Sequence, residues 1–140
     1  FKKTFFLVQK ELSLRDIIVI SVGLFGHADG EYKTCIDQEK KEMLDRLHRR
    51  KIDLFDGIFV INYGGYIVES TKSEIEYAKE NNKFIFFLQD DELSNSLTPP
   101  ISHPPKWFNR IKEVKEIAMK NYQNDLDKII DECQKDGGVL

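Results

Sequence analysis

The chain contains little cysteine, proline or tryptophan, and it has no long apolar run. Its 140 residues include two Cys, four Pro and one Trp. Cys35 and Cys133 lie far apart, in neither a metal-ligand nor a redox spacing, which is typical of free thiols in a reducing compartment. No stretch approaches the roughly 20 apolar residues that span a bilayer, and no signal-peptide pattern opens the chain. We therefore expect a cytoplasmic protein with no membrane partner.

An excess of charge of one sign is also lacking. The 21 Lys and Arg residues and the 24 Asp and Glu residues are interspersed, and the formal net charge is -3. A nucleic-acid surface would gather basic residues into a stripe, so we expect a small-molecule ligand and no nucleic acid. His27, His48 and His103 have no metal-ligand spacing, and we expect neither a metal nor a cofactor. The length and the 41% hydrophobic content suit a single domain, residues 1–140, with a real core.

Three short runs are continuously apolar and rich in β-branched or aromatic residues. They are DIIVISV (16–22), GIFVIN (57–62) and KFIFFLQ (83–89). Continuous apolar runs, as opposed to alternating ones, predict strands covered on both faces, as in a parallel sheet. Amphipathic segments of helical length occupy residues 35–54 and 71–81, between the runs. The chain thus alternates helix and strand.

The two ends of the chain also show helical spacing. Phe5, Val8 and Leu12 precede the first run, and the apolar residues within 122–133 repeat the pattern. The alternation predicts a doubly wound, three-layer α/β/α fold. Because such folds begin with a strand, we expect a first strand to be missing before Phe1.

Proline is confined to one segment, TPPISHPP (98–105). Proline removes backbone donors and fixes φ, so this segment predicts a surface connection and neither a helix nor a central strand. A weak further strand is expected at Val114–Ile117. We find no internal repeat.

Ligands of open α/β sheets bind beyond the carboxyl ends of the strands. Three segments are expected to converge there: GLFGHADGEY (23–32), NYGGYIVEST (62–71) and QDDELS (89–94). Glycines let a backbone approach a ligand closely, and aromatic rings can stack on a base or a sugar. The same glycines are also explained by ordinary turns, and the same rings by packing. Taken together, the three segments predict a binding site.

Thr71 and Glu74 have two competing interpretations. Thr71-x-x-Glu74 matches a capping box, which would account for both residues. A carboxylate in the first turn of a helix is also favoured in its ionised form by the helix dipole, and an ionised carboxylate can act as a nucleophile. The pattern alone leaves both interpretations open.

Residues 13–89 resemble a known family. KIDLFDGIFVIN, followed by GGYIVESTKSEIEYAKENNKFIFFL, is similar to the core of the nucleoside 2-deoxyribosyltransferase family, and GLFGHADG with GGYIVEST resembles a bacterial and phage subgroup of it. The resemblance implies a flavodoxin-like parallel sheet, a homo-oligomer of two or more subunits, and a nucleophile that falls on Glu74. It also implies that Asp56, just before a strand, contacts the sugar or the base.

The implied reaction is N-glycosidic bond cleavage or base exchange on 2-deoxynucleosides or their 5'-monophosphates. Glu74 would attack C1' to form a covalent glycosyl ester, and a second base or water would resolve it. The expected binding residues are Gly23, Phe25, His27, Asn62, Gly64, Gly65, Tyr66, Glu69, Ser70 and Thr71, with Tyr63 a further ring for stacking. Asp53 is a further candidate acid beside Asp56, and Glu69 is the expected second carboxylate.

Two other functions compete with this one. The first is a catalytically inactive module of the same fold that binds a nucleotide or senses one. The second is an FMN-binding flavodoxin-like protein, which is disfavoured because no Ser/Thr-rich phosphate loop follows the first apolar run. A Glu74→Gln change separates the enzyme from the binding module, because Gln also serves in a capping box.

Overall fold

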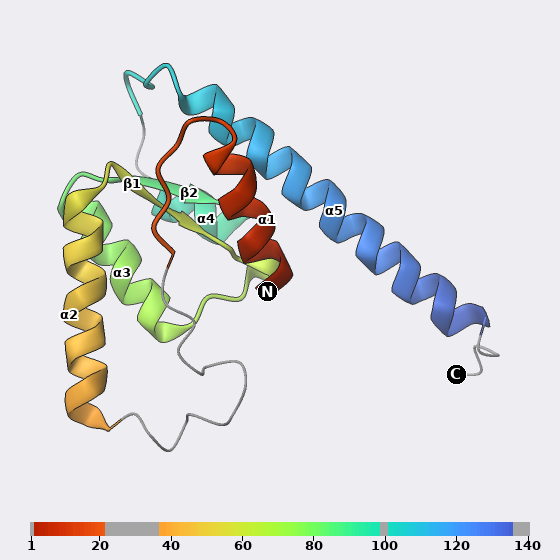
Figure 1. Cartoon of the computed structure of the whole chain (residues 1–140), viewed down its shortest axis with the longest axis horizontal. Coiled ribbons are helices and arrows are strands. Elements are labelled where there is room, and N and C mark those ends of the chain that lie inside the picture. The colour runs from red at the N-terminus through yellow and green to blue at the C-terminus, as the bar shows by residue number, and fades with distance from the viewer. Residues whose placement is uncertain (1, 22–36, 99–100, 136–140) are drawn as a thin grey trace. The chain divides into compact units, whose positions relative to one another are not determined.

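The structure is a computed structural model that describes residues 2–21, 37–98 and 101–135. The chain divides into two compact units, one formed by residues 1–18 with 101–140 and the other by residues 19–100. Along the sequence the elements are α1 (Lys2–Ser13), α2 (Gln38–Leu54), β1 (Gly57–Val60), the short 3-10 turn η1 (Tyr63–Gly65), α3 (Glu69–Glu80), β2 (Phe84–Phe87), α4 (Glu92–Leu97) and α5 (Phe108–Lys135) (Figure 1).

The first unit pairs α1 with α5, two helices that lie far apart in the sequence. Lys3 bonds Asp125 at 3.0 Å, and Arg15 bonds Glu113 at 3.0 Å. The residue numbers rise along one helix as they fall along the other, so the helices run antiparallel. Each helix buries apolar residues at helical spacing: Val8 and Leu12 on α1, and Ile111, Val114 and Ala118 on α5. The helices expected at both ends of the chain are therefore confirmed, but the buried stripe of α5 lies at 111–118, before the predicted residues 122–133.

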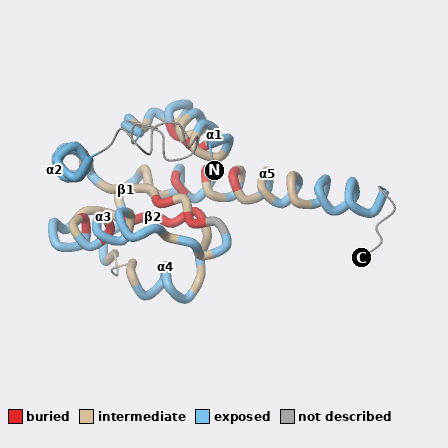
Figure 2. Tube along the Cα trace, turned by 90° about the horizontal axis from the view of Figure 1, so that it is seen from below, coloured by how far each residue is buried: buried red, intermediate tan, exposed pale blue. Residues whose placement is uncertain are grey.

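The second unit is built on a parallel pair of strands. β1 and β2 pair in register from Gly57 opposite Phe84 to Val60 opposite Phe87. The α3 helix connects them, and Ile75 and Ala78 of α3 pack with Ile85 of β2 in one apolar cluster. Figure 2 shows this buried region as the red part of β1, β2 and α3. The expected strands at 57–62 and 83–89 and the expected helix at 71–81 are confirmed, with shifted ends. The helix expected at 35–54 is confirmed over Gln38–Leu54, and residues 35 and 36 lie outside the described residues.

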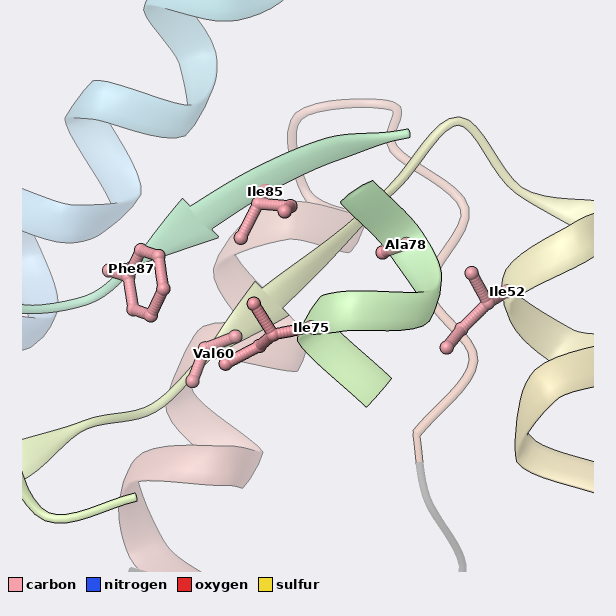
Figure 3. Close-up of a cluster of buried hydrophobic side chains, with 6 residues drawn as sticks. All are labelled: Ile52, Val60, Ile75, Ala78, Ile85 and Phe87. Atoms are coloured by element: carbon pink, nitrogen blue, oxygen red, sulfur yellow. The ribbon is translucent and has the colours of Figure 1, made fainter. Parts of the chain in front are cut away.

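The apolar cluster is completed by α2. Ile52, near the end of α2, joins Val60, Ile75, Ala78, Ile85 and Phe87 (Figure 3). Alternate residues of β2 point to opposite faces, so Ile85 and Phe87 lie toward this cluster. Phe84 and Phe86 lie on the other face, with their rings stacked at a centroid distance of 6.1 Å. The cluster therefore fixes α2 and α3 on one face of the sheet.

The predicted doubly wound three-layer fold, with its flavodoxin-like sheet, is wrong. The described residues are mostly helical, and among them only β1 and β2 form a sheet. Residues 16–21, which cover almost all of the first predicted strand, form no strand. Two of its exposed residues, Ile18 and Ile20, are 81% and 50% accessible.

The end of α1 accounts for part of this error. Asp16 has a φ of 61°, its N–H bonds Ser13 O, and the Ile17 N–H bonds Leu12 O. These two bonds with a left-handed residue between them form a Schellman motif, which satisfies carbonyls at a helix end. Asp16 and Ile17 thus complete a helix cap, and the run that follows has no described strand beside it.

The weak strand predicted at residues 114–117 is also wrong. These residues lie inside α5, where Ile111, Val114 and Ala118 form one buried helical stripe. A β-branched pair in a short window favours a strand, but the longer period of 3 to 4 residues decided the outcome. The proline segment is a connection, as expected, over its described residues 101–105.

Candidate functional site

The carboxyl ends of β1 and β2 are joined by Asn62. Its side chain is fully buried, its Nδ2 donates to Gln89 O at 2.9 Å, and its Oδ1 accepts from Gln89 N at 2.9 Å. One amide therefore satisfies both backbone groups of a residue that follows β2. Asn62 was predicted to bind substrate, and the structure places it as a buried clamp between the two strand ends.

The glycine pair after β1 forms a tight turn. Gly64 and Gly65 have φ values of 64° and 75°, in the left-handed region where glycine has no steric penalty. The Gly64 N–H donates to Gln89 Oε1 at 3.0 Å, and the Gly65 N–H donates to Asn62 O at 3.1 Å. A Cβ at position 65 would come within 3.3 Å of Asp91 Oδ2. The pair thus directs the chain from the end of β1 toward α3.

Three other predicted binding residues lie on the solvent side of this region. Tyr66 is 65% exposed, and Glu69 and Ser70 are exposed at the first two positions of α3. The Glu69 carboxylate lies 3.4 Å from Lys72 Nζ, a surface pair that contributes little to stability. These side chains are accessible to a ligand. Gly23, Phe25 and His27, the other predicted binding residues, lie outside the described residues.

The capping-box interpretation of Thr71-x-x-Glu74 is wrong. The α3 helix begins at Glu69 and its N-cap is Val68, which makes no side-chain cap bond. Thr71 is the third residue of the helix, and Glu74 is the sixth. Glu74 is therefore beyond the first turn, so neither helix capping nor proximity to the helix N-terminus explains this carboxylate.

The contact that Glu74 does make is with α2. Glu74 Oε1 lies 2.8 Å from His48 Nδ1, and the two side chains are 24% and 20% exposed. The α2 and α3 helices lie beside each other (Figure 1), so this bond crosses their interface. An ionised carboxylate only accepts hydrogen bonds, so His48 is the donor. The result is a partly accessible carboxylate whose orientation is fixed by an imidazole.

His48 was missed as a partner of Glu74 at the level of sequence. The two residues are 26 positions apart, and the only visible signal was that each lies on an amphipathic helix. Periodicity identifies which face of a helix is apolar, but it does not identify which residues of two helices meet. That pairing depends on the relative placement of α2 and α3 through the cluster of Ile52, Ile75 and Ala78.

Asp56 lies at the other end of the sheet from the glycine turn. It is exposed and immediately precedes β1, and its backbone O accepts from Phe84 N at 3.0 Å. Asn62, Gly64 and Gly65 follow the opposite, carboxyl end of β1. The structure therefore brings Asn62 and the glycine turn together before α3, and it places Asp56 at the amino end of the strand.

Asp53 takes part in a second polar contact between α2 and α3. The Tyr77 hydroxyl donates to Asp53 Oδ1 at 2.7 Å, and Arg49 lies over the Tyr77 ring at 5.7 Å from its centroid. The hydrogen bond to Asp53 raises the pKa of the Tyr77 phenol, and desolvation and the negative charge of Asp53 act in the same direction. The Asp53 carboxylate thus joins α2 to α3 through the Tyr77 hydroxyl.

Within residues 2–21, 37–98 and 101–135, no group of three or more His, Cys, Asp or Glu side chains could hold a metal ion. In the same ranges, every helix is too short or too polar to cross a membrane.

Comparisons with protein-family models, with curated proteins and with solved structures found no match to this chain.

Proposed function

We propose that this chain cleaves the N-glycosidic bond of a 2-deoxynucleoside or its 5'-monophosphate, with Glu74 as the nucleophile. One observation carries the proposal: Glu74 is a partly exposed carboxylate, and it is held by His48 instead of capping its own helix. The resemblance of residues 13–89 to the nucleoside 2-deoxyribosyltransferases supports the choice of substrate.

The chemistry requires two displacements at the anomeric carbon. A carboxylate oxygen of Glu74 forms a bond to C1' while the C1'–N bond breaks, and the electron pair leaves with the base, which takes up a proton. In the second step the nitrogen of another base, or water, forms a bond to C1' while the bond from C1' to the Glu74 oxygen breaks. The acceptor gives up its proton to solvent, and the carboxylate is released. The acceptor decides whether the protein acts as a transferase or a hydrolase.

The substrate would lie along the first two turns of α3. Ser70 is four residues before Glu74 and Thr71 is three before it, so all three side chains share a helix face. Ser70 is exposed, and its hydroxyl would donate to a sugar oxygen or a phosphate. Tyr66, 65% exposed just before the helix, would stack on the base.

The test compares wild type with Glu74→Gln. Each protein is incubated with 2'-deoxynucleosides and their 5'-monophosphates, with and without a second free base, and base release or exchange is followed by chromatography. Gln keeps an oxygen that can accept from His48, so the contact between α2 and α3 persists while the nucleophile is lost. We expect wild type to release base and Glu74→Gln to release none.

Glu76→Gln is the matched control. Glu76 lies two residues further along α3, is exposed, and undergoes the same chemical change. It should keep wild-type activity. If wild type and Glu74→Gln bind nucleotide equally and neither releases base, the proposal fails and a binding or sensing module without turnover is the better description. Base release by Glu74→Gln at the wild-type rate would exclude Glu74 as the nucleophile.

A further inference from the structure

His48 is a residue that the reaction chemistry alone does not call for. Its Nδ1 lies 2.8 Å from Glu74 Oε1, and it comes from a different helix than the nucleophile. The distance is within the range of a charge-assisted hydrogen bond from an N–H to a carboxylate. Such a bond fixes which oxygen of the carboxylate is engaged and leaves the other, Oε2, to react.

The two helices hold this contact in a defined place. Ile52 of α2 packs in the same apolar cluster as Ile75 and Ala78 of α3. The Tyr77–Asp53 hydrogen bond, at 2.7 Å, joins the same two helices further along both. Side chains on packed helices with locked neighbours are positioned more accurately than side chains on loops. The orientation of the imidazole toward Glu74 is therefore set by the fold.

We propose that His48 is a positioning residue for the nucleophile, an inference that rests on the proposed function. Its Nδ1–H donates to Glu74 Oε1 and orients the carboxylate so that Oε2 attacks C1'. The proton of His48 stays on Nδ1 through both displacements. The bonds that form and break are the Oε2–C1' and C1'–N bonds, and the electron pair of the latter leaves with the base.

The distance argues against a role for His48 as the general acid or base. In retaining glycosidases the nucleophile and the acid/base group flank the scissile bond and are about 5–5.5 Å apart. His48 is in direct hydrogen-bond contact with Glu74, so it would lie on the same side of a bound anomeric carbon as the nucleophile. The leaving base departs from the opposite face. A different group must therefore give the base its proton.

The experiment separates positioning from proton transfer by moving the donor. His48→Asn places a side-chain N–H near the position of Nδ1, whereas His48→Gln places one near the position of Nε2, and His48→Ala removes it. The kcat and KM for base release are measured for each variant and for wild type. Thermal unfolding of each variant checks that the fold persists.

We expect His48→Asn to keep kcat within about fivefold of wild type. His48→Ala and His48→Gln should lose kcat by about a hundredfold with little change in KM, because a misplaced nucleophile slows the step without weakening binding. If His48→Ala does not fold, the comparison of Asn with Gln still tests the position of the donor. A contact that only joins two helices would change the melting temperature and leave kcat unchanged.

The outcomes distinguish this inference from the proposed function. If wild type releases no base, the proposed function itself is wrong. If wild type is active and His48→Ala has the same kcat, only the role of His48 is refuted. If His48→Asn is as slow as His48→Ala, the imidazole acts by proton transfer, and positioning is likewise refuted.

Discussion

The two compact units of the chain bury apolar side chains in different ways. The unit of residues 19–100 surrounds a two-stranded sheet, and its cluster draws on α2, α3 and both strands. The unit formed by the two ends of the chain pairs α1 with α5 along one seam. In the sheet unit, alternation along a strand and helical periodicity must agree. In the α1–α5 unit, only the register between two helices matters, and it is marked by the Lys3–Asp125 and Arg15–Glu113 ion pairs.

The difference is clearest in α5. Its buried residues, Ile111, Val114 and Ala118, lie in its first half. The same face continues to Ile129, which is 56% exposed. Figure 2 draws the second half of α5 mostly as intermediate or exposed. A helix can therefore keep its apolar period beyond the region where it packs. In the sheet unit, by contrast, the apolar residues of β2 are buried or partly buried along its whole length.

The largest expected effect comes from truncating core residues in each unit. Ile75→Ala and Ile111→Ala should each lower the free energy of unfolding by about 2–5 kcal/mol, because both side chains are almost fully buried. Ile130→Ala, the matched change on the exposed part of α5, should stay within about 0.5 kcal/mol. Urea unfolding of the three variants measures this. A large effect of Ile130→Ala would mean that this part of α5 is covered in solution.

A smaller loss of folding stability is expected for Asn62→Asp. The carboxylate can still accept from Gln89 N, but it has no N–H to donate to Gln89 O, so a buried acceptor loses its partner. A buried polar group left without its hydrogen bond costs about 1–3 kcal/mol, and a charged one costs more. Thermal unfolding of Asn62→Asp should show this loss, while Asn95→Asp, at an exposed site on α4, should be neutral.

The sheet can be tested at a glycine where space is limiting. A Cβ at Gly57 would lie 2.6 Å from Phe84 O, so Gly57→Ala must push β1 away from β2 and should cost about 1–3 kcal/mol. Gly64 has open space but a positive φ, so Gly64→Ala should cost about 1 kcal/mol through backbone strain alone. Gly64→Asn should recover part of that cost, because Asn tolerates this conformation. Equal melting temperatures for Gly57→Ala and wild type would contradict the observed strand pairing.

The smallest expected effect is a pH dependence at the α2–α3 interface. Because the hydrogen bond to Asp53 favours the protonated phenol, the pKa of Tyr77 is raised above its usual value of 10.0. The stabilisation is present below that value and is lost as pH rises through the raised pKa of the folded state. The ultraviolet absorbance of wild type and of Tyr77→Phe is titrated with pH, and the difference between the two curves should show the raised pKa of Tyr77. Asp53→Asn should reduce this rise in pKa. An unshifted Tyr77 titration would mean that the bond is absent in solution.

Much of the local structure could be predicted from the sequence, but the fold class could not. The apolar runs at 57–62 and 83–89 gave strands because α3 connects them and covers one face. The run at 16–22 is also continuously apolar, yet its first residues complete the cap of α1. A short apolar run does not carry the information about whether a partner strand lies beside it.

Part of the candidate site could likewise be predicted from the sequence, and part could not. The position of Glu74 on an amphipathic helix and the glycine turn were both visible in the sequence. The start of α3 was misplaced by two residues, and this small shift removed the capping box, because capping depends on the exact helix boundary. The buried role of Asn62 and the pairing of Glu74 with His48 could not be predicted, since both depend on segments more than 25 residues away.

The sequence by itself determined α1, α2, α3 and the later part of α5, together with two short strands, because periodicity and propensity act over a few neighbouring residues. It did not predict α4. The tertiary structure decided which faces meet, that only two of the expected strands pair among the described residues, and that an imidazole on α2 holds the carboxylate on α3. These outcomes depend on packing between distant segments. Many arrangements satisfy the same local pattern, and the energy of the whole fold selects one of them.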